Sequence, residues 1–212
     1  MLGSALGGSD TAAQSVFSGV VEAVRGLDLA AFDRVVAMLA DVRARGARVY
    51  IVGNGGSAAT GSHLACDLAK STGDRAHERV RAVALSDAIP LLTAWGNDAG
   101  FEQVFASQLE VLLEPGDGVV AISVSGNSPN VVAALDTARY LGALTVGLFG
   151  ADGGKARALV DVALVVPSRD YGVVESVHLA IAHAMTASLR AWGLAGAGSS
   201  LATRLVPRAA SD

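Results

Sequence analysis

The sequence has few charged residues, few aromatic residues and a single cysteine. Charged side chains make up 17% of its 212 residues, below the roughly 25% that is usual for a soluble domain, whereas 51% are apolar. We therefore expect a large core, with part of the apolar surface buried between subunits. Cys66, the lone cysteine, excludes an intramolecular disulfide framework and fits a reducing cytoplasm.

Two further absences limit the function. The chain has 16 basic and 20 acidic side chains, a net charge of −4, so direct binding to nucleic acid or to an anionic membrane is not expected. No uninterrupted apolar run reaches the roughly 18 residues of a membrane span. The amino terminus also lacks the basic and apolar regions of a secretory signal. We expect a cytoplasmic protein with no membrane partner.

Short β-branched runs alternate with helical patterns through most of the chain. Strands are expected at 48–53, 80–85, 118–123, 144–149 and 162–166. Helices are expected at 11–25, 28–45, 57–70, 88–95, 99–113, 129–140 and 172–192. Apolar strands that alternate with helices are typical of a parallel sheet covered on both faces. The sequence thus predicts an α/β fold: a three-layer α/β/α sandwich with a mostly parallel, doubly wound five-stranded sheet, preceded by N-terminal helices.

The two ends of the chain differ in character. Asp28 suits the N-cap of the second helix, so residues 11–45 read as two helices ahead of the sheet. The last helix is apolar on nearly every face, so we expect it to be buried, partly by another subunit. Residues 193–212 are small, polar and unpatterned, and we expect them to be disordered. Residues 1–192 are expected to form a single domain.

Two loops that follow predicted strands carry groups that can bind phosphate. The stretch 53–57, Gly-Asn-Gly-Gly-Ser, ends the first strand, and glycines there let backbone N–H groups converge on an anion. The third strand ends at Ser123, and Ser125 and Ser128 follow, the latter at an expected N-cap. Each serine alone suits a turn or a cap. Their cluster at the carboxyl end of a central strand predicts phosphate binding.

Other nucleotide-binding patterns fit poorly. Gly53, Gly55 and Ala58 match the G-x-G-x-x-A pattern of dinucleotide-binding proteins, which needs an acidic residue about 20 positions further on. The nearest candidate, Asp87, lies 34 residues after Gly53. No lysine of the P-loop type follows either loop, which argues against nucleoside triphosphate hydrolysis.

Five polar residues on two predicted helices can carry chemistry. His63 and Asp67 lie four positions apart on one face, where they can bind a metal, exchange protons or form an ordinary surface pair. Glu175, His178 and His183 need partners within an apolar helix. His178 faces away from His183 and reads as structural. Glu175 and His183 are about 12 Å apart along the axis, so Glu175 reaches along the helix or serves another site or subunit.

Together these residues resemble the sugar isomerase (SIS) domain proteins and, within them, the phosphoheptose isomerases. The resemblance covers nearly all of residues 10–192. The matching segments are 53–59 with His63, 84–87, 96–98, 123–128, 152–155, and 166–168 with Glu175, His178 and His183.

The resemblance implies a homotetramer with active sites between subunits and with residues 11–45 as oligomerisation helices. It implies a ketose–aldose isomerase that converts sedoheptulose 7-phosphate to D-glycero-D-manno-heptose 7-phosphate by metal-assisted proton transfer through an enediolate. A carboxylate and an imidazole can move the protons while a divalent cation stabilises the developing oxyanion.

The resemblance also implies roles for individual residues. Substrate and phosphate binding fall on Asn54, Gly55, Ser57, Asp98, Ser123, Ser125 and Ser128. Metal binding falls on His63, Asp67, Glu175 and His183, and catalysis on Asp67, Glu175 and His183. The expected cofactor is a divalent metal, zinc (Zn2+) first, although manganese, iron and nickel also accept mixed imidazole and carboxylate ligands.

The chain departs from the family pattern at several of these positions. Asp67 stands where a glutamate is usual, and Glu175 stands where a glutamine is usual. Val124 replaces a threonine of the serine loop (residues 123–128), and Gly172-Val173 replaces an Asp-Arg pair. Two alternatives therefore stay open: an isomerase of another sugar phosphate, and a non-catalytic SIS-domain protein that binds phosphosugars or associates with a replication initiator.

Overall fold

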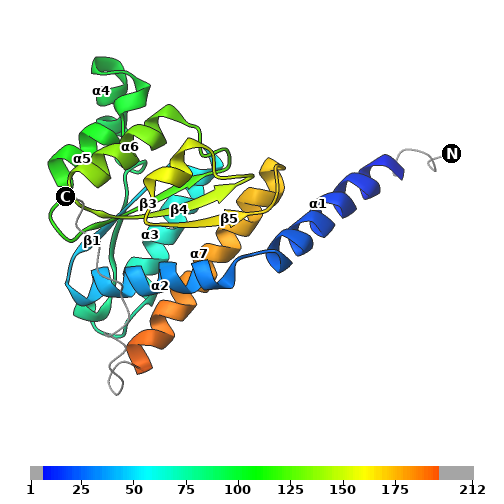
Figure 1. Ribbon diagram of the computed structural model, residues 1–212, viewed down its shortest axis with the longest axis horizontal. Helices are drawn as coiled ribbons and strands as arrows, with labels where there is room; N and C mark the ends of the chain where they lie inside the picture. Colours follow the sequence, from blue (N-terminus) through cyan, green and yellow to red (C-terminus); the bar gives the residue numbers. More distant parts are fainter. Residues whose placement is uncertain (1–6, 196–212) are drawn as a thin grey trace, which may run out of the picture.

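Five parallel strands form one sheet in the order β2-β1-β3-β4-β5 in the computed structural model, which describes residues 7–195 (Figure 1). The strands are β1 (Arg48–Gly53), β2 (Arg81–Ala84), β3 (Gly118–Ser123), β4 (Leu144–Gly150) and β5 (Val162–Val166). The α-helices are α1 (Gly7–Arg25), α2 (Leu29–Ala44), α3 (Gly56–Ser71), α4 (Ile89–Asp98), α5 (Ala106–Leu112), α6 (Pro129–Tyr140) and α7 (Tyr171–Ala195). Short 3-10 turns are η1 (Ala76–Glu78), η2 (Phe101–Gln103) and η3 (Lys155–Leu159).

Helices cover both faces of this sheet because alternate residues of each strand point to opposite sides. In β1, Val49 and Ile51 pack into a core shared with α2, α3 and α7. Tyr50 and Val52 belong to a second core with α5 and α6 (Figure 1). All strand pairs run parallel. The predicted three-layer sandwich with a doubly wound parallel sheet is confirmed.

The two predicted N-terminal helices are also present. Asp28 caps α2, since its side chain accepts a hydrogen bond from the Ala31 N–H at 2.9 Å. The amino-terminal part of α1 points away from the sheet (Figure 1), and of residues 11–25 only Ala23 is buried. This helix therefore exposes apolar side chains that its own chain does not cover.

Three sequence-based boundaries need correction. The predicted helix at 99–113 divides into η2 and α5 at a turn of residues 104–105, and Gly100, with a positive φ of 91°, separates η2 from α4. Asn97 and Asp98 lie in the last turn of α4, not in a turn before a helix. The last helix continues to Ala195, beyond the expected end at 192. The rest of the predicted disordered tail, 196–212, lies outside the described residues.

The long helix α7 buries one face and exposes the other within the chain. Its buried stripe includes Val174, Val177, Ile181, Met185 and Leu189, at the spacing of an amphipathic helix. The expected burial of its other face by another subunit stays a prediction. Within residues 7–195, no helix combines the length and hydropathy needed to cross a membrane.

One polar residue of α7, His178, is fully buried in the core. Neither ring nitrogen makes a hydrogen bond within the described part of the chain. Burial lowers the pKa of His178 to about 4, and a weaker polar contact with the backbone of Phe149 opposes this shift. The imidazole is therefore neutral near pH 7, which agrees with the structural role expected from its position in the sequence.

We expect His178 to make stability depend on pH. Because its folded pKa of about 4 lies below its ordinary 6.5, the unfolded chain binds this proton more readily. Its contribution to stability is complete above pH 6.5 and falls toward pH 4 by about 1.4 kcal/mol per pH unit. Urea unfolding at pH 6.5 and pH 5 should show that the wild type loses about 2 kcal/mol more than His178→Leu. Equal losses would contradict this assignment.

Candidate functional site

The sheet topology creates a crevice between β1 and β3. From β1 the chain winds outward to β2 by way of α3 on one face of the sheet, whereas β3 continues through α6 on the other face to β4 (Figure 1). Ligands of open α/β sheets bind where the winding reverses in this way, beyond the carboxyl ends of the strands. The loops after β1 and β3, which carry the predicted phosphate-binding groups, meet at that point.

A cavity of about 100 Å³, here named the serine cavity, lies between these two loops. Asn54, Ser57, Ile122, Ser123, Val124, Ser125, Ser128, Tyr171 and Glu175 line it. The structure thus brings together five of the side chains that the sequence assigned to phosphate binding. Gly55, the sixth residue of that region, precedes α3 with a positive φ of 53°.

The serine hydroxyls of the cavity have partners in their own turn and still have hydrogen-bonding capacity left. Oγ of Ser123 accepts from the Gly126 N–H at 3.1 Å, and Oγ of Ser125 accepts from the Asn127 N–H at 3.2 Å. Each hydroxyl proton can still donate to a ligand. Ser128 occupies the N-cap of α6 without a side-chain capping bond. The turn role and the ligand role of these serines are therefore compatible.

Backbone dipoles supply the positive potential of the cavity. Both α3 and α6 begin beside it, and neither has a side-chain hydrogen bond at its N-cap. Unpaired N–H groups at a helix N-terminus attract anions. No lysine or arginine is among the residues that line the cavity. It can therefore bind a phosphate through hydroxyl and backbone donors.

The carboxylate of Glu175 lies in this same cavity, against the first residue of α3. A Cβ built on Gly56 would meet the carboxylate of Glu175, so a larger residue there would displace the end of this flexible side chain. Within residues 7–195 the structure shows no hydrogen bond or ion pair to this carboxylate. A phosphate bound by the serines would therefore meet a like charge.

Three other predicted residues converge further along the same helices. His63 and Asp67 lie on α3, and His183 lies on α7. Nε2 of His63 lies 2.9 Å from Nε2 of His183 and 3.3 Å from Oδ2 of Asp67. Nε2 of His183 lies 3.9 Å from the same oxygen. One donor atom from each residue lies within 4.8 Å of the others, on a partly exposed surface.

These donors fit a divalent metal. Ligand atoms of a tetrahedral zinc ion with bonds of about 2.0–2.1 Å lie about 3.3 Å from one another. The separations of 2.9, 3.3 and 3.9 Å scatter around that value. Two imidazoles and one carboxylate leave a fourth position open, as in catalytic zinc sites.

Two predicted site residues do not join their expected partners within the chain. Glu175 is not part of the cluster of His63, Asp67 and His183, and lies instead in the serine cavity. Asp98 is exposed at the end of α4, where its carboxylate accepts a hydrogen bond from Asn97, and does not line the cavity. Sequence reasoning missed Tyr171, which lines the cavity. Its position just before the predicted last helix carried no signal.

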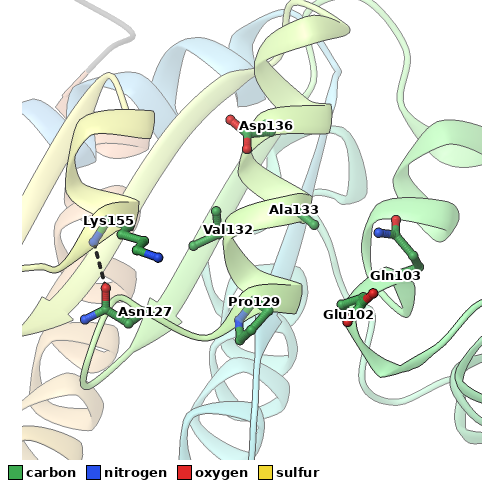
Figure 2. A pocket seen from close by; sticks show the side chains of 8 residues that line it. All are labelled: Glu102, Gln103, Asn127, Pro129, Val132, Ala133, Asp136 and Lys155. Atoms are coloured by element: carbon green, nitrogen blue, oxygen red, sulfur yellow. Dashed lines mark hydrogen bonds between the residues drawn. The ribbon is translucent and has the colours of Figure 1, made fainter.

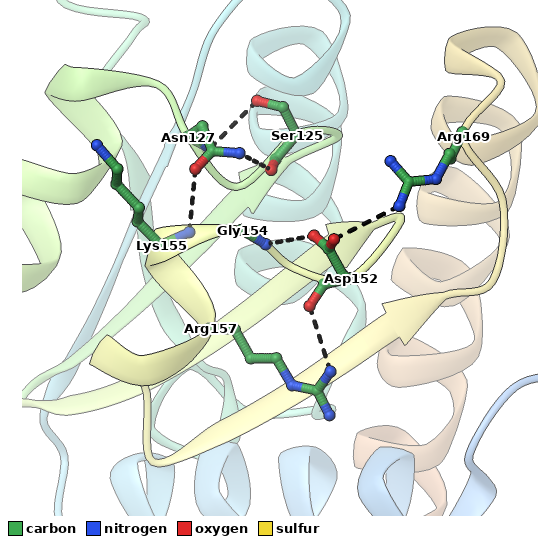
Figure 3. A network of polar contacts seen from close by, with 7 residues as sticks. All are labelled: Ser125, Asn127, Asp152, Gly154, Lys155, Arg157 and Arg169. Carbon is green, nitrogen blue, oxygen red and sulfur yellow. Dashed lines mark hydrogen bonds and ion pairs between the residues drawn. The ribbon is translucent and has the colours of Figure 1, made fainter.

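Residues 151–155, which follow β4, contact the serine loop. Oδ1 of Asn127 accepts from the Lys155 N–H at 3.1 Å, and Nδ2 of Asn127 donates to the Ser125 carbonyl (Figure 3). Asp152 caps the same loop by accepting from the Gly154 N–H at 3.1 Å. A Cβ on Gly126 would lie 1.9 Å from the Gly153 carbonyl oxygen, so the two loops touch through backbone.

A second, more open cavity of about 350 Å³ lies on the outer side of the serine loop. It is bordered by α6, η2 and Lys155 (Figure 2). Its charged side chains are Glu102, Asp136 and Lys155. None of the predicted catalytic or metal-binding residues lines it, so the inner cavity is the better candidate site.

Comparisons with known proteins agree with this geometry. The family model of the SIS domain matches residues 10–150. The chain is 46% identical to the phosphoheptose isomerase of Pelobacter propionicus over 151 residues, which are 70% of this chain and 78% of that protein. The solved phosphoheptose isomerase GmhA from Neisseria gonorrhoeae superimposes with a TM-score of 0.78 at 31% identity, covering 86% of this chain and 98% of that one.

The fold, the serine loop and the family match identify the chain as a member of the SIS domain family. Within that family it belongs to the phosphoheptose isomerases. It is therefore an enzyme of the aldose–ketose isomerase class, as the resemblance implied.

Replacement of Glu175 should strengthen anion binding. One negative charge about 5 Å from a phosphate opposes it by roughly 1–3 kcal/mol at a partly exposed site. We expect Glu175→Gln to bind inorganic phosphate about tenfold more tightly in titration calorimetry. The matched control is Asp136→Asn, which removes the same charge from the outer cavity and should change affinity less than twofold. Unchanged or weaker binding by Glu175→Gln would contradict the repulsion.

Proposed function

We propose that this chain converts sedoheptulose 7-phosphate to D-glycero-D-manno-heptose 7-phosphate. Its membership of the phosphoheptose isomerases supports the substrate class. The serine cavity and the cluster of His63, Asp67 and His183 supply the two sites that such a reaction needs. One site holds the phosphate, and the other moves protons next to the carbonyl group.

The observation that carries this proposal is the placement of both sites along one pair of helices. Glu175 meets Gly56 near the start of α3, and His183 meets His63 further on, so α3 and α7 run side by side in the same direction. Ser57 and His63 are six residues apart, about 9 Å along α3. An extended seven-carbon sugar measures about 10 Å from C1 to phosphorus on ordinary bond lengths. The spacing suits a substrate that spans both sites.

In the proposed reaction, Asp67 and His183 move the protons. Both imidazoles face Oδ2 of Asp67, which leaves Oδ1 free to take a proton from C1 of the ketose. His183 passes a proton between the oxygens on C1 and C2 of the resulting enediolate, and Asp67 returns the proton it took to C2, which gives the aldose and restores both side chains. The serine loop and Ser57 hold the phosphate, so the reactive end is positioned by its distal anchor.

We propose that His63, Asp67 and His183 hold a divalent metal, with zinc as the first candidate. A metal in that position would stabilise negative charge on the carbonyl oxygen. Glu175 lies in the serine cavity and not in this cluster, so we assign it no part in proton abstraction. We propose that Asp98 of a neighbouring subunit contacts the sugar.

We also propose a homotetramer with a cytoplasmic location. Val16, Phe17, Val21 and Val24 form an exposed apolar stripe on α1, and α4 has no buried residue. Apolar patches of this kind mark protein interfaces. The exposed thiol of Cys66 suits a reducing compartment. Residues 1–192 would act as a single SIS domain in which α1 and α2 serve association.

His183→Ala should abolish turnover of sedoheptulose 7-phosphate. The substitution removes both a metal donor and the group that moves a proton between the two substrate oxygens, so we expect kcat to fall at least about 1000-fold. A coupled assay measures turnover, light scattering checks that the assembly is unchanged, and calorimetry with zinc should show at least about tenfold weaker binding. Chelation of the wild type should remove activity that zinc restores. Undiminished activity in His183→Ala would overturn the catalytic assignment.

A panel of ketose phosphates tests the substrate assignment. Sedoheptulose 7-phosphate should have the highest kcat/KM, because its length matches the distance between the two sites. A higher value for a five- or six-carbon ketose phosphate would favour the alternative isomerase. If no sugar phosphate is turned over, the binding-protein alternative is favoured.

Phe17→Asp should disrupt the assembly. Phe17 is 71% exposed at the centre of the α1 stripe, and a charge there opposes burial between subunits. We expect light scattering to report a smaller particle than the wild type. Ser15→Asp places the same charge on the opposite face of α1 and should leave the mass unchanged. A Phe17→Asp protein of wild-type mass would contradict the role of this stripe.

A further inference from the structure

The side chain of Asn130 links the two loops of the serine cavity. Asn130 is the second residue of α6 and is only 2% exposed. Its Nδ2 donates to Oδ1 of Asn54, and Nδ2 of Asn54 donates to Oδ1 of Asn130, both at 2.8 Å. The partners are 76 positions apart in the sequence. The pair therefore joins the loop after β1 to the first turn of the helix after β3.

This pair continues the pairing of the strands beyond the end of their ladder. The register of β1 and β3 ends at Gly53 and Ile122. Past that point, among the hydrogen bonds between described residues, only the two bonds of Asn54 and Asn130 cross from one loop to the other. Beyond the ladder, this amide pair therefore adds a direct link between the loop that precedes Ser57 and the helix that follows the serine loop.

The reciprocal geometry also fixes the direction of the Asn54 amide. A primary amide has two N–H donors and one oxygen with two lone pairs. The bonds to Asn130 use one N–H and one lone pair, so the second N–H of Asn54 can donate into the cavity that this residue lines. Asn130 itself does not line the cavity. Any effect of Asn130 on a ligand is therefore transmitted through Asn54 and the loop positions.

We propose that Asn130 is a positioning residue for the phosphate end of the substrate. It holds the loops after β1 and β3 at the separation that lets their donors meet on one phosphate, and it aims the Asn54 amide at that phosphate. This inference deepens the proposed function and rests on the assignment of phosphate to the serine cavity. It assigns no chemical step to Asn130.

The loss of this pair should weaken phosphate binding more than it slows the chemical step. Asn130→Leu keeps a similar volume and removes both hydrogen bonds, leaving the Asn54 amide unpaired. We expect the Kd for inorganic phosphate and the KM for sedoheptulose 7-phosphate to rise about tenfold, with kcat changed less than threefold. A merely structural role would lower the melting temperature without this split between KM and kcat.

A double-mutant cycle tests whether Asn130 acts through Asn54. Phosphate affinity is measured by calorimetry for the wild type, Asn54→Ala, Asn130→Leu and the double variant, with circular dichroism as a check of folding. If the pair acts as a unit, Asn130→Leu weakens binding less than about twofold further once Asn54 is alanine. Asn127→Ala serves as the matched control, because Asn127 braces the serine loop without touching Asn54. The fold-change in the Kd for phosphate caused by Asn127→Ala should multiply with that caused by Asn54→Ala, as expected for independent sites.

Three outcomes would overturn the proposal: wild-type affinity in a folded Asn130→Leu protein, independent effects of Asn54→Ala and Asn130→Leu, or no phosphate binding by the wild type. If Asn130→Leu does not fold, Asn130→Ser, which keeps one short polar group in the same turn, replaces it in the cycle. The proposed function fails separately, when the wild type binds phosphate and shows the expected coupling but turns over no sugar phosphate.

Discussion

The central constraint in this molecule is the adjacency of β1 and β3 at the point where the chain reverses its winding. Because α3 leaves β1 on one face and α6 leaves β3 on the other, a crevice lies between the carboxyl ends of these two strands. The N-termini of both helices face the resulting crevice, and their N–H groups can attract an anion although none of the described lining residues is a lysine or an arginine. The serines add hydroxyl donors to the positive electrostatic potential of the two helix N-termini.

Because α3 packs against α7, the serine cavity and the cluster of His63, Asp67 and His183 lie a fixed distance apart. Both helices begin beside the serine cavity and run together to the cluster of His63, Asp67 and His183. A helix is a rigid spacer of about 1.5 Å per residue, so the positions of these residues in the sequence set the distance between the two ends of a ligand. The side chains of this cluster are partly exposed, as are apolar side chains of α1 and α4.

Much of this arrangement could be predicted from the sequence. The periodicity placed every strand and the parallel, doubly wound sheet, because buried strands and amphipathic helices have distinct repeats. It placed the serine loop at a strand end and His63 with Asp67 on one helical face. It could not place Glu175, because eight residues of separation fix an axial distance without showing which neighbouring helix the side chain meets. The packing of α7 on α3 decides that question.

Tertiary contacts also explain the other differences. The 99–113 segment has a helical apolar pattern, but a turn at residues 104–105 divides it, and Gly100 separates it from α4 with a positive φ that composition alone did not require. Asn130 escaped notice because its partner, Asn54, is distant in sequence and the two meet only when β1 and β3 pair. Their amides join two loops that pattern analysis treats separately.

The most direct test of the central claim is a crystal structure of the assembled protein with zinc and sedoheptulose 7-phosphate. The account predicts that the phosphate lies among Ser57, Ser123, Ser125 and Ser128. It also predicts that the metal lies between His63, Asp67 and His183 and that C1 and C2 face this cluster. A phosphate bound outside the crevice between β1 and β3, or a metal bound away from those three residues, would contradict it.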